Sequence, residues 1–398
     1  MNTRLLAPDL ARGMMLLFIA LANVSLYLWG GETGYYSQHP TGEGLLSTYL
    51  ASGVILFIDG SVYPMFAFLF GYGITLFATS RLAKGLPLKE VNLMLLRRHI
   101  WLLIFGAVHA ILLFAGDILG AYALTGLVLA PLLVRATERT VRIILWSLGG
   151  IIAGTMILGT ISLVLLQLLV PPQFLDFQSG VEGDIPSIAF LMNGISNYPL
   201  AMLSRFGLWI ASSISALPTL IVPFTVLLGG YAARFNWLEG LSKSFRLKPV
   251  ACWGISVGVI ASLPLALHHL GLWELNSLNL ISFQILSQLF GIANGIGYIA
   301  LFALLSRRSG FLIDAISAIG KRSLSFYLFQ SIIFAPLLAA WGFGIGSRID
   351  SATAYLIATS VWIFSLIFAM LLERKNTAGP AEHILRKLTY GKYTITAK

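Results

Sequence analysis

FGAVHAILLFAGDILGAYALTG, residues 105–126, is apolar over most of its length but contains one histidine, His109, and one aspartate, Asp117. Similar apolar runs recur along the chain, which is 57% hydrophobic with a mean hydropathy of +0.85. Soluble domains usually carry about 25% charged residues, whereas this chain carries 11%. Because the runs are continuous and do not alternate as in a transmembrane β-barrel, the sequence predicts an all-α polytopic membrane protein.

A helix needs about 20 apolar residues to cross the hydrocarbon core of a bilayer. By this criterion the chain has about ten transmembrane helices, at residues 12–30, 59–80, 98–116, 117–135, 143–170, 201–231, 249–268, 281–305, 319–341 and 351–373. The fifth and sixth are longer than a bilayer requires. Residues 45–57 are apolar but short, which fits an interfacial helix or an extension of the second span. The N-terminal run is interpreted as an uncleaved first span.

The basic residues indicate how these spans are oriented. Of the 26 Lys and Arg residues, all except Arg205 and Arg348 fall at the termini or in the even-numbered connections. The positive-inside rule therefore places both termini in the cytoplasm. The net charge of +10 is explained by this topology. Since no basic face outside the membrane is evident, we expect no nucleic acid partner.

The domain organisation follows from the spans. We predict one transmembrane helical domain, residues 1–373, followed by a basic cytoplasmic tail, residues 374–398. The loop after the fifth span is acidic and contains Asp176, Glu182 and Asp184. Because the connections are too short for a soluble domain of useful size, the function is expected among the helices and their short loops.

His109 and Asp117 are the first candidates for catalysis. A charge at membrane depth costs at least about 2.5–3.5 kcal/mol, so such residues are usually paired, hydrated or functional. Eight residues along a helix separate the two by about 12 Å and about 80° around the axis. His109 is a candidate general base or acyl carrier, the alternative being a packed histidine bonded to a carbonyl. Asp117 is a candidate cap for the following helix that also orients the His109 ring.

Asp59 and Asn23 are two further polar residues near or within spans. Asp59 belongs to the sequence IDGSVYP, in which Asp-Gly indicates a turn and the proline suits the first turn of a helix. It is the third catalytic candidate, with a helix cap as the alternative. Asn23 lies in the middle of the first span and is assigned to the substrate cavity, with an interhelical hydrogen bond as the alternative.

Other polar residues are predicted to line a substrate cavity. Ser323, Tyr327 and Gln330 follow one another at helical spacing on one face of the ninth span. A polar stripe on a span faces a cavity or another helix. Arg205 is the unusual positive charge on the side opposite the termini, and we expect it to pair with Asp59, Asp117 or a substrate anion.

No metal site is expected. Cys252 is the single cysteine, and His268 and His269 are adjacent, so their side chains diverge by about 100° on a helix. The sequence contains no HExxH motif, phosphate-binding glycine loop or G-x-S-x-G element.

Five sequence elements resemble a known family. PDLARGMMLLFIALAN, IDGSVYPMFAFLFGYG, RRHIWLLIFGAVHAILLFAGDILGAYALTG, GKRSLSFYLFQS and GPAEHILRKLTYG together resemble the YeiB-like family of bacterial inner-membrane proteins, a domain-of-unknown-function family. That family is similar to a larger group of transmembrane acyltransferases, which includes heparan-α-glucosaminide N-acetyltransferase. The resemblance implies transfer of an acyl group from a cytoplasmic acyl-CoA donor to an acceptor on the far side of the inner membrane.

The acyltransferase group places its essential histidine between its first two spans. The histidine of this chain in that interval is His39, in an outer loop, and the residues around it do not match the group. The D-x-x-R-G element, in contrast, falls on Asp9, Arg12 and Gly13. We therefore choose His109 as the catalytic histidine from its position and chemistry.

The resulting hypothesis is a membrane acyltransferase. Arg12, Arg97, Arg98 and Arg322 are expected to bind the phosphates of acyl-CoA, and a small molecule or glycan is expected as acceptor. Membrane lipids are expected partners, and a homodimer is a candidate assembly. The alternatives are a small-molecule or lipid transporter or flippase, which normally needs a midplane site and inverted repeats, and a non-catalytic membrane scaffold.

Overall fold

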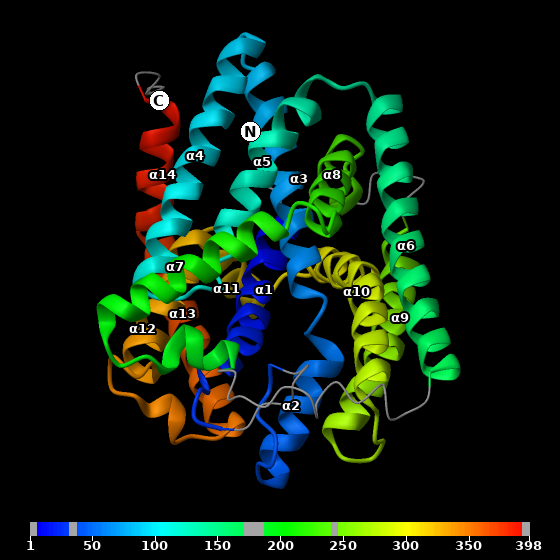
Figure 1. The fold of residues 1–398 in the computed structure, drawn as a ribbon. Helices are drawn as coiled ribbons and strands as arrows, with labels where there is room; N and C mark the ends of the chain where they lie inside the picture. The colour runs from blue at the N-terminus through cyan, green and yellow to red at the C-terminus, as the bar shows by residue number, and fades with distance from the viewer. Residues whose placement is uncertain (1–5, 32–37, 171–186, 240–245, 392–398) are drawn as a thin grey trace.

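A computed structural model describes residues 6–31, 38–170, 187–239 and 246–391. Within these ranges the regular structure is helical (Figure 1). The α-helices are α1 (Leu6–Val24), α2 (Leu45–Phe57), α3 (Val62–Leu82), α4 (Leu88–Leu112), α5 (Leu119–Arg135), α6 (Glu138–Leu169), α7 (Tyr198–Ser215), α8 (Ile221–Arg234), α9 (Leu247–His269), α10 (Ser277–Leu305), α11 (Phe311–Gly320), α12 (Ser323–Leu338), α13 (Ser351–Arg374) and α14 (Pro380–Tyr390). The predicted acidic-loop residues Asp176, Glu182 and Asp184 lie outside the described residues, as does the tail after Gly391.

The all-helical membrane class is confirmed. Among the described residues, seven helices are long and apolar enough to cross a membrane: α1, α3, α4, α6, α9, α10 and α13. Five shorter apolar helices, α2, α5, α8, α11 and α12, accompany them. The segment 45–57 is thus a separate helix, since the chain turns at Asp59 and Gly60 before α3 begins.

The predicted sixth span, residues 201–231, is not one helix. It consists of α7 and α8, which are separated between Ser215 and Ile221. Pro218 disfavours helical backbone at the residue before it, and Leu220 adopts the left-handed conformation with φ 61°. Pro223 is tolerated because it stands in the first turn of α8. The unusual predicted length of this span therefore came from joining two helices.

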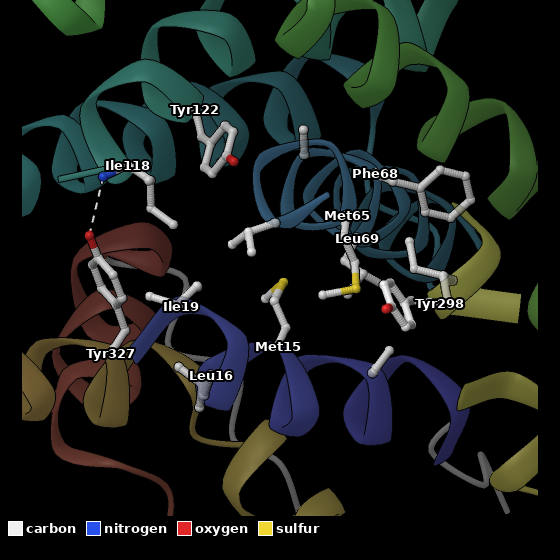
Figure 2. Packing of buried hydrophobic residues seen from close by; sticks show 14 of the residues in the cluster. Met15, Leu16, Ile19, Met65, Phe68, Leu69, Ile118, Tyr122, Tyr298 and Tyr327 are labelled. Carbon is white, nitrogen blue, oxygen red and sulfur yellow. Dashed lines mark hydrogen bonds between the residues drawn. The ribbon is translucent and has the colours of Figure 1, made fainter. Parts of the chain in front are cut away.

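Helix α1 lies at the centre of the molecule, where it contacts α3, α10, α11 and α13. Figure 2 shows Met15 of α1 facing Met65 and Leu69 of α3 in the apolar core, with Leu16 and Ile19 at neighbouring positions on α1. These five side chains are no more than 2% exposed. The central position of α1 means that the polar residues near its two ends lie beside several other helices.

Helices α3 and α8 cross so closely that their backbones are in van der Waals contact. A Cβ atom on Gly71 would lie 1.9 Å from the Val226 carbonyl oxygen, and one on Gly229 would lie 1.9 Å from the Phe68 carbonyl oxygen. Small residues permit this close approach between membrane helices. The glycine-rich segment after Pro64 is therefore explained by helix packing.

Part of the predicted tail is a structured helix. Helix α14 packs on α4 and α12, and Figure 1 shows it running alongside α4. Glu382 of α14 accepts hydrogen bonds from the backbone N–H groups of Leu324 (2.7 Å) and Ser325 (3.1 Å). A carboxylate at this position caps the first turn of α12 and complements its dipole. The GPAE element thus fixes α14 to the helical domain.

Candidate functional site

The described part of the chain encloses two large cavities. The histidine cavity has a volume of about 1470 Å³. It is lined by three histidines (His39, His268 and His269), two aspartates (Asp59 and Asp117) and neutral polar residues that include Asn23, Tyr63, Tyr122, Gln284 and Gln288. The arginine cavity, of about 850 Å³, is lined by residues of α1, α3, α4, α12 and α14. Its basic lining residues are Arg12, Arg81, Arg98, Lys321, Arg322 and Arg386. The two cavities therefore differ strongly in charge.

A histidine–aspartate pair lines the histidine cavity. His39 Nε2 lies 2.7 Å from Asp59 Oδ2, and the His39 ring is buried while the Asp59 side chain is 34% exposed. On its other edge, His39 Nδ1 lies 3.0 Å from the Tyr355 hydroxyl and 3.1 Å from Ser25 Oγ. Both members of the pair line the cavity, and the carboxylate is the more exposed of the two, while Tyr355 and Ser25 contact the other edge of the imidazole.

The turn before α3 places Asp59 in this position. Gly60 has a φ of 76°, which favours glycine, and Ser61 Oγ donates to the Ile58 carbonyl oxygen at 2.6 Å. This turn directs the Asp59 side chain toward His39, so its observed partner is an imidazole, in contrast to the helix cap considered from sequence. The catalytic candidate Asp59 thus acquires a partner that the sequence analysis had set aside.

From sequence, His39 was not chosen as a candidate, because the residues around it match no motif. The signal that favoured it was its position between the first two predicted spans, close in sequence to Asp59. Its partners Ser25, Asp59 and Tyr355 come from three distant parts of the chain. Local sequence therefore gave no indication that a polar cluster forms there.

His109 and Asp117 form a second pair. His109 Nδ1 lies 2.7 Å from Asp117 Oδ2, and both side chains are buried. Asp117 Oδ1 accepts hydrogen bonds from the Gly120 N–H (3.0 Å) and from Trp209 Nε1 (3.2 Å). The carboxylate thus caps the start of α5 and also holds the His109 ring. Both contacts were predicted from the sequence, the helix cap and the contact with His109.

The surroundings of the two members of this pair differ. Asp117 lines the histidine cavity, whereas His109 lines neither cavity. His109 Nε2 is buried and has no hydrogen-bond partner among the described residues. The predicted catalytic histidine is therefore packed behind Asp117 and its ring faces Tyr327, with ring centroids 5.1 Å apart.

Three of the four arginines predicted to bind acyl-CoA line the arginine cavity: Arg12, Arg98 and Arg322. Arg97 is not among its lining residues, although it precedes Arg98. Arg98 lies over the Phe77 ring at 5.8 Å, and its buried Nε has no hydrogen-bond partner among the described residues. Arg98 is thus well suited to meet an anion in the cavity.

Arg322 serves a different role. Its guanidinium donates to the Thr377 carbonyl oxygen from Nε (3.0 Å) and from Nη2 (2.6 Å), and to the Ala318 carbonyl oxygen from Nη1 (3.0 Å). Nη1 also pairs with Glu373 Oε2 at 2.7 Å. These bonds connect α11, α13 and the segment before α14, so Arg322 is primarily a structural residue of the cavity wall.

Helix α14, which contains most of the GPAEHILRKLTYG element, forms part of the wall of the arginine cavity. Arg386, Thr389 and Tyr390 of α14 line it. The Tyr390 hydroxyl accepts a hydrogen bond from Arg81 Nη2, and the Arg81 guanidinium lies 5.1 Å from the Tyr390 ring centroid. The segment predicted as a tail therefore contributes directly to a candidate binding site.

The residues predicted to line a substrate cavity have separate locations. Asn23 lines the histidine cavity, and Ser323 and Tyr327 line the arginine cavity. Gln330 lines neither cavity, since it is buried and Nε2 donates to the Leu16 carbonyl oxygen at 2.9 Å. Tyr327 and Gln330 thus share a helix face but contact different parts of the protein.

Arg205 also lies outside both cavities, in contrast to its predicted role. It is 0% exposed, and Nε donates to the Ile111 carbonyl oxygen at 3.0 Å while Nη2 donates to that of Leu112 at 3.4 Å. The guanidinium also lies over the rings of Tyr198 and Trp341. A cation at the C-terminal carbonyls of α4 satisfies exposed acceptors and complements the helix dipole.

The two cavities approach each other at the start of α5. Asp117 and Ile118 line the histidine cavity, and the next residue, Leu119, lines the arginine cavity. Tyr327, on the arginine side, accepts a hydrogen bond from the Ile118 N–H at 3.2 Å and donates to Asp117 Oδ2 at 3.4 Å. Figure 2 shows the Tyr327 hydroxyl reaching from α12 to Ile118. A single layer of side chains thus separates the cavities here.

The described ranges contain no group of three or more His, Cys, Asp or Glu side chains placed to hold a metal ion.

Comparison with known proteins relates the chain to bacterial proteins of similar length. Residues 232–392 match the family described as "Protein of unknown function (DUF418)". The chain is 26% identical to the uncharacterized protein YeiB of Escherichia coli K12, covering 96% of this chain and 95% of that protein. It is 25% identical to the uncharacterized protein YxaH of Bacillus subtilis 168, covering 100% and 97%. An uncharacterized 39.9 kDa protein of Bacillus acidopullulyticus is 23% identical over 100% and 97%.

Proposed function

We propose that this chain, which is similar to YeiB and YxaH and matches DUF418 over residues 232–392, is a membrane acyltransferase with both termini in the cytoplasm of a bacterial inner membrane. The proposal rests chiefly on one observation: a basic cavity and a cavity with a His–Asp pair meet across one layer of side chains. The positive-inside distribution supports assigning the arginine cavity to the cytoplasmic side.

The arginine cavity is the proposed binding site of the acyl-CoA donor. Arg98, Arg12 and Arg386 offer guanidinium groups, which bind phosphate oxygens through charge-assisted hydrogen bonds. Apolar side chains, among them Phe66, Leu69 and Leu102, line the same cavity. The polar and apolar parts of the lining therefore suit a phosphorylated nucleotide with a neutral arm that points into the membrane.

The histidine cavity is the proposed acceptor site. An acceptor hydroxyl or amine would bond to the Asp59 carboxylate, which is the exposed member of the pair. As its oxygen or nitrogen attacks the thioester carbonyl carbon, a new C–O or C–N bond forms and the C–S bond breaks. The acceptor proton passes to the His39–Asp59 pair and is then transferred to the departing CoA sulfur.

The pair is well organised for this proton transfer. Tyr355 and Ser25 fix the Nδ1 edge of His39, and Asp59 fixes the Nε2 edge. The ring therefore needs no reorientation during the reaction, which lowers the cost of catalysis. The neutral amide and hydroxyl groups around the pair, such as Asn23 and Gln284, support a small polar molecule or glycan as acceptor.

The proposal is tested with the purified full-length protein by measuring CoA thiol release from acetyl-CoA. Water is the default acceptor, and glucose and glucosamine are added as probe acceptors. Thiol release that requires the protein and rises with a probe acceptor is the expected result. Absence of release with all three acceptors, from protein that binds acetyl-CoA, would argue against an acyltransferase.

A transporter is the second candidate, because two cavities separated by a thin wall are also compatible with alternating access. The break between α7 and α8 resembles the interrupted helices of such proteins. Flux of a glycan or lipid through proteoliposomes without acyl-CoA would favour this candidate, whereas flux that depends on acyl-CoA and yields acylated product would favour the acyltransferase.

A further inference from the structure

The layer that separates the two cavities contains a tyrosine at its most polar point. We propose that the acyl group crosses between the cavities at the Asp117–Tyr327 contact, and that the Tyr327 side chain determines the size of the acyl group that passes. This inference rests on the proposed acyltransferase function. It concerns residues that the proposed chemistry at His39 and Asp59 does not use.

The first argument is the position of the contact. Tyr327 lines the arginine cavity and Asp117 lines the histidine cavity, yet Tyr327 Oη and Asp117 Oδ2 are 3.4 Å apart. Moving the Tyr327 side chain would therefore join the two cavities without displacing a helix. The neighbouring part of the wall, where Phe66 stacks on Tyr122 at 5.0 Å, consists of two aromatic rings in parallel contact and offers no comparable polar contact.

The second argument is how Tyr327 is held. Its hydroxyl has one donor partner, the Ile118 N–H, and one acceptor partner, Asp117, both at distances above 3.1 Å. Each bond can be exchanged for one to a substrate carbonyl or water, because Ile118 and Asp117 face the histidine cavity. Two hydrogen bonds, with the Ile118 N–H and Asp117, thus hold Tyr327 in the layer between the cavities, and a substrate or water can replace both.

The third argument concerns His109, the buried histidine that the proposed chemistry leaves without a role. Its ring lies against Tyr327 and bonds to the same Asp117 oxygen that accepts from the tyrosine. Gly120 and Trp209 hold the other oxygen of Asp117. His109 is therefore a positioning residue: it fixes the Asp117 carboxylate, which accepts the hydrogen bond from the Tyr327 hydroxyl.

A cysteine accessibility experiment tests the crossing point independently of catalysis. In a Cys252→Ser background, Leu119→Cys reports on the arginine cavity and Ala121→Cys reports on the histidine cavity. Sealed proteoliposomes are treated from the histidine side with a charged, membrane-impermeant methanethiosulfonate. We expect rapid modification of Ala121→Cys and slow modification of Leu119→Cys. Adding Tyr327→Phe, which preserves volume but removes both hydrogen bonds, should accelerate modification of Leu119→Cys at least 10-fold.

The control is Phe326→Leu, which changes a buried residue of the same helix that lines neither cavity and should leave both rates unchanged. If Tyr327→Phe and Tyr327→Leu both leave Leu119→Cys as slow as in the parent, the cavities do not connect at Tyr327 and the inference is overturned. The same conclusion follows if Phe326→Leu accelerates modification equally.

A second experiment tests acyl-size selection. The ratio of kcat/KM for hexanoyl-CoA over acetyl-CoA is measured from thiol release, and Tyr327→Leu should raise it at least 10-fold relative to the parent. An unchanged ratio in an active, folded variant would refute size selection by Tyr327. If the parent protein releases no thiol at all, the proposed function fails, while the accessibility experiment still decides whether the cavities meet at this tyrosine.

Discussion

His39 and Asp59 are joined by a 2.7 Å contact between Nε2 and Oδ2, although the whole of α2 lies between them in the sequence. The contact forms because the chain turns at Gly60, after α2, and this turn directs the Asp59 side chain toward His39. It brings a buried imidazole to a carboxylate that faces a cavity of about 1470 Å³.

Removing either member of the pair should abolish acyl transfer. General acid–base groups contribute about 10²–10⁴-fold to rate, so His39→Gln and Asp59→Asn should each lower kcat for thiol release by at least about 100-fold, with KM for acetyl-CoA little changed. His383→Gln is the matched control, since His383 is an exposed residue of α14 that lines neither cavity. Retention of full kcat in both pair variants would remove the catalytic role.

Arg98 and Arg97 should differ although they are neighbours. Arg98 lines the arginine cavity and Arg97 does not. Loss of one charge-assisted hydrogen bond is worth about 1.5–3 kcal/mol, so Arg98→Gln should raise the KM for acetyl-CoA about 10-fold or more. Arg97→Gln should leave it within about 2-fold. Equal effects of the two substitutions would contradict the assignment of the phosphates to this cavity.

Arg205 should matter for stability and not for substrate binding. Arg205→Gln leaves the Ile111 and Leu112 carbonyl oxygens without their donor, and an unsatisfied buried polar group costs about 1–3 kcal/mol. We expect a lower Tm in detergent and an unchanged KM for acetyl-CoA. Arg348→Gln, at an exposed position, serves as the control. A raised KM with an unchanged Tm would return Arg205 to the substrate site.

Glu382 should hold α14 against α12. Glu382→Ala removes the acceptor for the Leu324 and Ser325 N–H groups, and loss of a helix cap costs about 0.5–2 kcal/mol. We expect faster proteolysis of the segment before α14 and a raised KM for acetyl-CoA, because α14 lines the arginine cavity. Glu90→Ala, which changes a glutamate of α4 outside both cavities, should leave proteolysis and KM unchanged. Proteolysis at the wild-type rate would indicate that α14 is held by other contacts.

The stabilisation that Asp350 provides as the N-cap of α13 should depend on pH. Hydrogen bonds from Ser47, and then from Thr353, lower the pKa of Asp350 below its usual value. A group with a lowered pKa in the folded state stabilises the protein above its ordinary pKa, about 3.9, and this contribution is lost as the pH falls through the folded-state pKa. The Tm difference between the parent and Asp350→Asn should therefore be largest near neutral pH and shrink below about pH 4.

Two substitutions check this origin. Ser47→Ala removes the 2.6 Å hydrogen bond to Asp350 Oδ2 and should reproduce part of the Tm loss at neutral pH. Thr48→Ala, which removes a hydroxyl that donates to the backbone carbonyl oxygens of Glu43 and Gly44, should not alter the pH profile. A Tm difference that stays constant between pH 7 and pH 3 would show that the Asp350 charge does not contribute.

The sequence alone determined the class of the protein and most of its helices. Its low charge, long apolar runs and one-sided basic residues predict membrane helices because burial in lipid requires continuous apolar sequence. It also identified His109 with Asp117, which are close in the chain and joined by a short turn. The error at residues 201–231 has a local cause, since an apolar run does not show where a backbone turns at Leu220.

Only the tertiary structure decided which polar residues share a cavity. His39 meets Ser25, Asp59 and Tyr355 because packing brings together the segment after α1, the turn before α3 and helix α13, and no local pattern encodes those contacts. In the same way, Arg97 and Arg98 are indistinguishable as sequence, but they differ by a rotation of about 100° along α4, and only Arg98 is among the residues that line the arginine cavity. Hydropathy fixes how deep a residue lies, whereas the packing of distant helices fixes what it faces.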